Sequence, residues 1–167
     1  MKLYLLRHGL AVDRGTPEFE NDELRPLTPA GRRQLRRSTA AFAALDLRFD
    51  LILCSPLTRA RQTAKIVAAA MRFKGPVKAT NELKPGNNPK ALIQALNTMK
   101  PCPKSVLLVG HEPDLSRLIS LLVTGHIHAG LALKKGGLAK LKLERLAAGR
   151  CATLAWLLTP KHLLAMV

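Results

Sequence analysis

The stretch Lys2-Leu3-Tyr4-Leu5-Leu6-Arg7-His8-Gly9 begins with an apolar run and ends in an arginine, a histidine and a glycine. Apolar runs of this kind are typical of strands that are covered on both faces in a parallel sheet. The Arg7-His8-Gly9 tripeptide would then leave the sheet at the carboxyl end of the strand, where open α/β sheets bind their ligands. Taken alone, an arginine and a histidine at a strand end are usually accidental, so this prediction needs support from the rest of the chain.

The chain alternates between segments of strand character and segments of helical period. The expected strands are Lys2 to Leu6, Leu51 to Leu53, Val77 to Thr80 and Ser105 to Val109. Helices are expected to begin where a capping side chain precedes a proline, at Thr28-Pro29, Ser55-Pro56 and Asn88-Pro89, and a further helix is expected over Asp114 to Val123. This alternation predicts an α/β fold around a largely parallel central sheet.

The last third of the chain departs from this pattern. Leu138 to Leu143 alternates between apolar and other residues, and Thr153 to Leu158 is a second extended run. Such runs indicate an antiparallel pair at one edge of the sheet. With 167 residues, 47% of them apolar, and no repeat or linker, the chain is expected to form a single domain over residues 1–167.

The chain is strongly basic, with 27 Lys and Arg residues against 11 Asp and Glu residues and a formal net charge of +16. This charge favours acidic partners. Recognition of nucleic acid by base stacking is disfavoured, because the basic residues are scattered and the only aromatic residues are four Phe, one Trp and one Tyr. A solvated basic surface with no specific partner explains the charge equally well.

Cysteine usage favours a cytoplasmic protein. The three cysteines, Cys54, Cys102 and Cys151, are an odd number without C-x-x-C spacing, which argues against a disulfide framework and against a zinc knuckle. The first apolar run is interrupted at Arg7 and His8, so neither a signal peptide nor a membrane span is expected there. No other apolar run is long enough to cross a bilayer.

Arg59 lies about one turn into the predicted helix that follows the second strand. Helical side chains lean toward the helix N-terminus, so the Arg59 side chain is expected to point back to the sheet edge that carries His8. A cation at this end opposes the helix dipole, at a cost of about 0.3–1 kcal/mol. A phosphate group between the two would remove this conflict.

A second histidine, His111, follows the buried-strand pattern Val106-Leu107-Leu108-Val109-Gly110. Together, the three strand ends are expected to bring two imidazoles and two guanidinium groups to one place. Such a group of side chains is suited to binding a phosphoryl group. In that arrangement neutral His8 attacks phosphorus in line, while Arg7 and Arg59 bind the equatorial oxygens. His111 is the expected further donor, and the guanidinium charges are expected to lower the pKa of His8.

These segments resemble the histidine phosphatase superfamily. The resemblance rests on Arg7-His8-Gly9, the Ser-Pro-Leu-Thr-Arg-Ala-x-Gln-Thr-Ala stretch from Ser55 to Ala64, and Gly110-His111, in this order along the chain. Within the superfamily, the chain resembles the SixA-type phosphohistidine phosphatases. This narrower resemblance rests on the short length, on Asp22-x-x-Arg25-Pro26-Leu27-Thr28-x-x-Gly31 and on the turn Glu82-Leu83-x-Pro85-Gly86.

The resemblance implies a three-layer α/β/α sandwich, the phosphoglycerate mutase-like fold, with no metal and no other cofactor. It further implies removal of phosphate from phosphorylated histidine on a protein partner, such as a histidine-phosphotransfer domain. It assigns the nucleophile to His8, and it assigns phosphate binding to Arg7, His8, Arg59 and His111.

The general acid is harder to identify. Glu82 resembles the position at which larger relatives place a proton donor, but a glutamate that holds a loop backbone fits about as well. Glu112 and Asp114 are competitors, and Asp114 better suits a helix cap. A phosphoramidate substrate needs an acid less, because its leaving nitrogen can depart protonated.

A metal-independent site is expected, since no carboxylate cluster stands where a magnesium ion would be held. The spacing of His126-x-His128 suits a metal, but the sequence offers no third ligand. The pairs Arg32-Arg33 and Arg36-Arg37 can bind an acidic protein, although a solvated helix face is the default explanation of such a run.

Two other functions remain open. One is a small-molecule phosphomonoesterase or mutase of the same superfamily, although Leu10 to Leu27 leaves little length for a lid over a small substrate. The other is a non-catalytic basic module that binds nucleic acid or polyphosphate by charge. Activity on p-nitrophenyl phosphate that is lost in His8→Ala would separate an enzyme from such a module.

Overall fold

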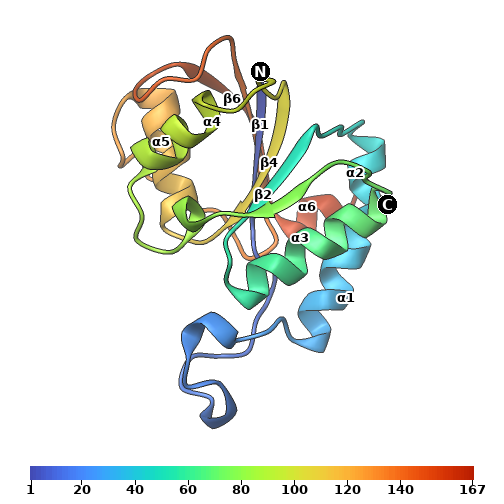
Figure 1. The fold of residues 1–167 in the computed structure, drawn as a ribbon. Coiled ribbons are helices and arrows are strands. Elements are labelled where there is room, and N and C mark those ends of the chain that lie inside the picture. Colours follow the sequence, from blue (N-terminus) through green and yellow to red (C-terminus); the bar gives the residue numbers. More distant parts are fainter.

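The computed structural model describes residues 1–167, in which helices pack on both faces of one six-stranded sheet (Figure 1). The strands are β1 (Lys2–Arg7), β2 (Leu51–Cys54), β3 (Val77–Ala79), β4 (Ser105–Gly110), β5 (Leu138–Leu143) and β6 (Ala152–Leu158). The α-helices are α1 (Pro29–Ser38), α2 (Ala40–Ala44), α3 (Thr58–Ala70), α4 (Pro89–Asn97), α5 (Asp114–Thr124) and α6 (Pro160–Leu164). Short 3-10 helices are η1 (Pro17–Phe19), η2 (Asp22–Leu24) and η3 (Asn81–Leu83). No helix combines the length and the apolar character needed to cross a membrane.

The sheet has the strand order β3-β2-β4-β1-β5-β6. The pairs β1 with β4, β4 with β2 and β2 with β3 are parallel, whereas β5 pairs antiparallel with both β1 and β6. The predicted largely parallel sheet and its antiparallel edge pair are therefore confirmed. Every residue of β4 is buried, in keeping with its almost uninterrupted apolar sequence.

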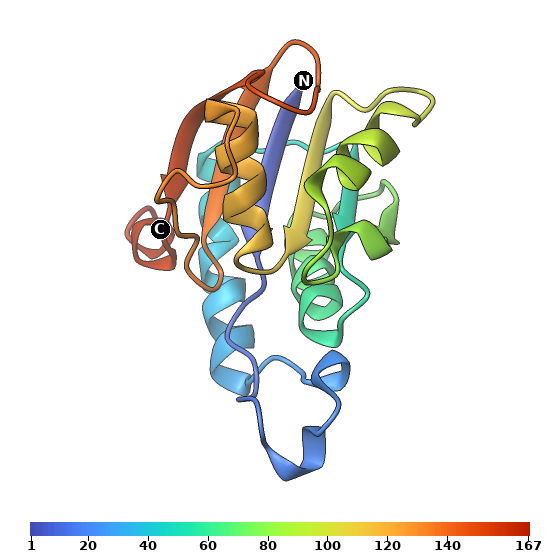
Figure 2. The same ribbon diagram turned by 90° about the vertical axis from the view of Figure 1, so that its left-hand side faces the viewer.

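Alternate side chains of the sheet enter two separate cores. Leu3 and Leu5 of β1 pack with apolar residues of α4 and α5, whereas Tyr4 and Leu6 pack on the other face with residues of α2 and α3. Figure 2 shows α4 and α5 in front of the sheet, with α1 and α3 on the far side. The three-layer α/β/α sandwich implied by the resemblance is confirmed.

Two of the three predicted helix starts are confirmed. The Thr28 side chain accepts a hydrogen bond from the backbone N–H of Gly31 (3.0 Å) and caps α1, and Asn88 caps α4 in the same way. The start at Ser55-Pro56 is wrong, because α3 begins at Thr58. Ser55 instead accepts from the N–H of Leu57 (3.3 Å), so its side chain stabilises the turn that leads from β2 to α3.

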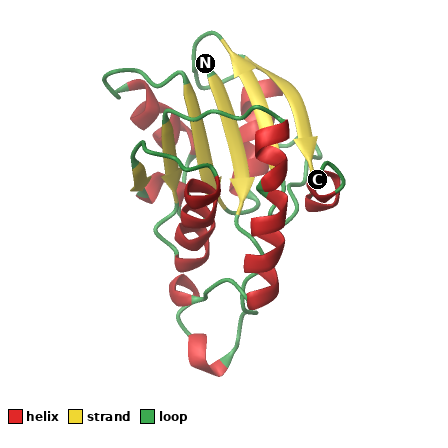
Figure 3. Ribbon diagram, turned by 90° about the vertical axis from the view of Figure 1, so that its right-hand side faces the viewer, coloured by secondary structure: helices red, strands yellow, loops and turns green.

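A loop over residues 10–28 projects beyond the carboxyl ends of the parallel strands, and Figure 3 shows its two short helices below the sheet. The base of the loop is closed by a hydrogen bond from Val12 N–H to the carbonyl oxygen of Pro26 (2.9 Å). A Cβ atom on Gly31 would lie only 2.2 Å from the carbonyl oxygen of Leu10. Glycine therefore lets α1 pack directly on the backbone of the loop and hold it beside the sheet edge.

Candidate active site

The carboxyl ends of β1 and β4 and the first turn of α3 bring the four predicted phosphate-binding residues to one pocket of about 340 Å³. These residues are Arg7, His8, Arg59 and His111. Seven further residues line the same pocket: Ala11, Asp13, Arg14, Arg25, Pro85, Glu112 and Lys135. Charged and imidazole groups dominate the lining, so the pocket suits a small, strongly anionic group.

His8 is 7% exposed, and its ring centroid lies 5.0 Å from that of His111. Nδ1 of His8 lies 2.8 Å from the carbonyl oxygen of Gly9. Because a carbonyl oxygen can only accept a hydrogen bond, the proton of the neutral ring stays on Nδ1. The lone pair is then on Nε2, which is the atom available for attack on an electrophile.

The two histidines are held in the neutral form. Burial lowers the pKa of His8 from 6.5 to about 3 despite the hydrogen bond to Gly9, and the positive charges of Arg59 and Arg7 add to the decrease. Burial also lowers the pKa of His111 to about 3, with a further contribution from His8. The predicted direction for His8 is confirmed, but burial has a larger effect than the guanidinium charges that the sequence suggested.

Several buried nitrogen atoms of the pocket residues have no hydrogen-bond partner within the chain. They are Nε of Arg7, Nε of Arg59, and both Nδ1 and Nε2 of His111. A buried donor without a partner costs about 1–3 kcal/mol. A group with several acceptor oxygens, such as a phosphoryl group, satisfies such donors together.

Arg59 is 2% exposed, and its guanidinium group binds Asp22 of the projecting loop. Nη1 donates to the backbone oxygen of Asp22 (2.7 Å) and Nη2 to its carboxylate (2.9 Å). Asp22 therefore supplies an anion beside the start of α3, a role that the sequence analysis had given to a phosphate group. The sequence contains this signal, because Asp22 and Arg25 belong to one of the segments that resemble SixA-type proteins.

Asp22 also holds Arg25, whose Nη2 lies 2.7 Å from the same carboxylate. Burial alone would raise the pKa of Asp22, but the hydrogen bonds from Arg25 and Arg59 outweigh it and lower the pKa to about 2. Asp22 is thus a carboxylate at any ordinary pH. It joins two pocket-lining arginines from different elements and so orders the loop against α3.

Arg7 and Glu112 bind the two peptide groups on either side of the Cα atom of Leu133, just before β5. Nη1 of Arg7 donates to the carbonyl oxygen of Leu133 (2.9 Å), and the N–H of Leu133 donates to Glu112 (3.0 Å). This pair positions the segment that carries Lys135 into the pocket. Lys135 was not predicted, although β5 pairs antiparallel with β1, so any residue just before β5 must lie near the carboxyl end of β1.

The proposed acids lie at different places. Glu82 lines a small neighbouring cavity with His111 rather than the pocket that contains His8. A hydrogen bond from the Thr80 hydroxyl lowers the pKa of Glu82, which favours its ionised form. Asp114 does not cap α5 as expected, and instead its carboxylate accepts from the N–H of Gly86 (2.9 Å). The acid role of Glu82 stays a prediction.

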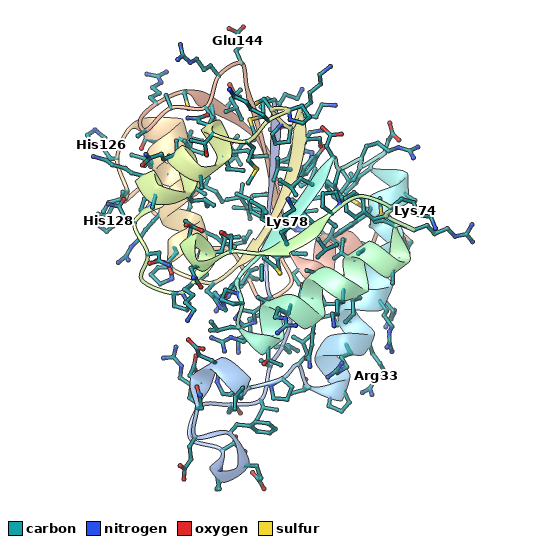
Figure 4. The ribbon with its side chains drawn as sticks, in the orientation of Figure 1. Arg33, Lys74, Lys78, His126, His128 and Glu144 are labelled. Carbon is teal, nitrogen blue, oxygen red and sulfur yellow. The ribbon has the colours of Figure 1, made fainter.

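The pair His126 and His128 lies on the loop after α5, and both side chains point away from the body of the molecule (Figure 4). Across residues 1–167, no three His, Cys, Asp or Glu side chains are grouped so that they could hold a metal ion. No other part of the chain therefore supplies a third metal ligand to His126 and His128.

Residues 3–86 match the model of the histidine phosphatase superfamily (branch 1). An uncharacterised protein of Picosynechococcus is 37% identical over 167 residues, which covers 98% of this chain and 99% of the relative.

The solved structures that carry the name SixA include two with high TM-scores. One is a candidate phosphohistidine phosphatase SixA from Agrobacterium tumefaciens, with a TM-score of 0.77 and 26% identity over 95% of this chain and 97% of that one. The other is the protein histidine phosphatase SixA in complex with tungstate, with a TM-score of 0.84 and 24% identity over 98% of this chain and 99% of that one.

The same fold also occurs in the α-ribazole phosphatase from Shigella flexneri, which has a TM-score of 0.64 and 21% identity over 96% of this chain and 97% of that one. The fold is therefore shared by phosphatases with different substrates. By its sequence, the chain belongs to branch 1 of the histidine phosphatase superfamily.

Proposed function

We propose that the chain is a metal-independent phosphatase that removes phosphate from phosphohistidine on a protein, with His8 as the nucleophile. One observation carries the proposal: buried His8, with Nδ1 2.8 Å from the carbonyl oxygen of Gly9, lies in the same pocket as Arg7, Arg59 and His111. The partner that fits this chemistry is a phosphorylated protein of the histidine-phosphotransfer kind.

In the first step, the lone pair on Nε2 of His8 attacks phosphorus in line, and the bond from phosphorus to the leaving nitrogen breaks. The electron pair of that bond goes to the leaving imidazole, whose other ring nitrogen already carries a proton in the substrate, so that it departs as neutral imidazole. Arg7 and Arg59 bind the equatorial oxygens, where negative charge is concentrated in the transition state. His111 donates a further hydrogen bond to one of these oxygens.

In the second step, water attacks the phosphohistidine formed at His8. The bond between Nε2 and phosphorus breaks, its electron pair returns to Nε2, and inorganic phosphate leaves with the oxygen of the water molecule. The low pKa of His8 helps here, because a weakly basic imidazole is a better leaving group.

Two features support a phosphoramidate rather than a phosphate ester as substrate. The carboxylate of Glu112, which lines the pocket, accepts hydrogen bonds from Leu133 and Ser116 and is thereby occupied. A phosphoramidate does not require a strong general acid, since its leaving nitrogen accepts a proton readily. A phosphate ester does require one, because its leaving group is an alkoxide. The names of the SixA structures, which refer to phosphohistidine, support the same substrate class.

A substrate comparison tests this proposal. We expect kcat/KM for a phosphohistidine peptide to exceed that for the matching phosphoserine peptide and for α-ribazole phosphate by at least a factor of about 100, equivalent to about 2.7 kcal/mol. His8→Ala is the control and loses turnover of all three. A preference for either ester would contradict the proposed substrate class and favour a small-molecule or ester phosphatase.

A further inference from the structure

A groove of about 410 Å³ lies between α1 and α3, outside the catalytic pocket. Its lining residues are Arg32, Arg36, Thr39, Gln62, Lys65, Ile66, Ala69 and Ala70. Ile66, Ala69 and Ala70 form an apolar strip on α3, and Arg32, Arg36 and Lys65 supply positive charge beside it. Figure 1 shows the two helices side by side, both beginning near the projecting loop.

The charge of this groove has no counterpart within the chain. Helix α1 contains four arginines, and helix α3 contains two arginines and one lysine. Neither helix contains an aspartate or glutamate. None of Arg32, Arg36 and Lys65 forms an ion pair, and the ion pairs nearest along the chain belong to Arg25 and Arg59. Unpaired basic side chains around an apolar strip are electrostatically complementary to an acidic amphipathic segment.

The groove begins close to the catalytic pocket. Gln62, at one end, lies one turn after Arg59, and its side chain accepts from the N–H of Leu27 at the base of the projecting loop (2.8 Å). With about 1.5 Å of rise per residue, the helix axis from Arg59 to Ala70 extends about 16 Å, or three turns. A helical segment of similar length therefore spans the groove while one of its ends reaches the pocket.

We propose that the α1/α3 groove docks an acidic amphipathic helix of the phosphorylated protein substrate. The inference rests on the proposed function for the nature of that substrate. Small residues such as Ala69 and Ala70 allow the backbone of another helix to approach closely. The apolar strip also favours a protein over a nucleic acid, which would require stacking groups that the groove does not offer.

The distribution of acidic residues favours one direction of approach. Five of the 11 acidic residues lie within residues 13–23 of the projecting loop: Asp13, Glu18, Glu20, Asp22 and Glu23. An acidic partner is repelled by the tip of this loop and attracted by the groove. The substrate is thus expected to lie along α1 and α3 rather than across the loop.

Peptide binding tests the inference directly. The probe is a fluorescein-labelled helical peptide of about 20 residues, long enough to span three turns, with glutamates along one face and alanine and leucine along the other. Its control has glutamine in place of every glutamate. We expect fluorescence anisotropy to show at least tenfold tighter binding of the glutamate peptide to the wild-type chain.

Two charge-reversal variants locate the binding surface. The variant with Arg32→Glu and Arg36→Glu changes the groove, whereas the variant with Arg33→Glu and Arg37→Glu makes the same change at two α1 positions that do not line it. We expect the groove variant to lose the preference for the glutamate peptide, and the control variant to keep it within about a factor of two. Melting curves of both variants check that they remain folded.

Three results would overturn the inference. If both variants lose the preference for the glutamate peptide equally, the peptide is attracted diffusely to a basic surface. If neither variant loses this preference, the peptide binds elsewhere. Tighter binding of polyphosphate or single-stranded DNA through Arg32 and Arg36 means a polyanion site. Turnover of a phosphohistidine peptide without an acidic helix is measured in parallel. If the wild-type chain does not turn this peptide over, the proposed function fails while the binding result stands.

Discussion

At the scale of single residues, the neutral state of His8 and His111 links stability to pH. Their pKa values in the folded chain are about 3, against 6.5 for free imidazole, so between these values the unfolded chain binds more protons. The free energy of unfolding therefore falls as pH decreases through this window, by up to about 1.4 kcal/mol per pH unit for each histidine, and does not change on their account above it.

Urea denaturation between about pH 4.5 and 6.5 measures this dependence, in a range that lies above the titration of Asp22. The double variant His8→Asn with His111→Asn is expected to show a shallower slope than the wild type. The same burial keeps His8 nucleophilic in acid, so kcat/KM is expected to show no inflection near pH 6.5 that belongs to His8. Equal slopes in the two proteins would mean that these histidines titrate normally.

Arg59 illustrates how a contact reverses an energetic expectation. Considered only as a cation at a helix N-terminus, it is unfavourable, and its removal would stabilise the fold. Because the structure pairs its buried guanidinium group with Asp22, we expect Arg59→Ala to lower the free energy of unfolding by about 1–3 kcal/mol and to abolish turnover. Chemical denaturation in phosphate-free buffer measures the first effect. A more stable variant would show that the ion pair contributes nothing.

At the scale of elements, the sequence predicts those whose pattern is local. All six strands were predicted within two residues, five of them from apolar or alternating runs that reflect burial, whereas all three residues of β3 are exposed. The predicted start of α3 was two residues too early, because Ser55 hydrogen-bonds within a turn rather than at a helix cap. Serine is favoured both in such turns and at helix caps, so the sequence does not distinguish the two.

The site shows the same limit of local patterns. The strand-end residues were predicted because the carboxyl ends of parallel strands meet at one edge. Lys135 reaches the pocket from the segment before β5, and Asp22 of the projecting loop binds Arg59, so both positions depend on contacts between residues far apart in the chain. Such contacts leave no period in the sequence, so the resemblance drew attention to the segment that contains Asp22, but the pairing of Asp22 with Arg59 became visible only in the structure.

Close packing of α1 on the projecting loop gives a prediction for that element. Gly31→Ala places a methyl group 2.2 Å from the backbone oxygen of Leu10, which cannot move without displacing the loop that carries Arg25. We expect a loss of about 1–3 kcal/mol in stability together with weaker phosphate binding. The control is Gln34→Ala on the same helix, which is expected to change neither quantity. Similar melting temperatures for the two variants would show that the loop yields at no cost.

At the scale of the whole molecule, the chain provides anion-binding groups at one edge of the sheet and no set of three grouped metal ligands anywhere. We expect turnover to continue after exhaustive treatment with EDTA. Vanadate is expected to inhibit competitively, because its trigonal-bipyramidal form resembles the transition state of phosphoryl transfer. Activity that disappears with EDTA and returns with magnesium or zinc would require ligands that the proposed mechanism does not use.

The covalent intermediate at His8 is the most direct test of the proposed mechanism. The enzyme is mixed with an excess of phosphohistidine peptide, quenched in alkali within the first turnover, and digested for mass spectrometry, because phosphohistidine survives base and is lost in acid. The account predicts one phosphoryl group on the peptide that contains His8, which disappears on acid treatment and is absent from His8→Ala. Phosphorylation at another residue, or undiminished turnover by His8→Ala, would contradict it.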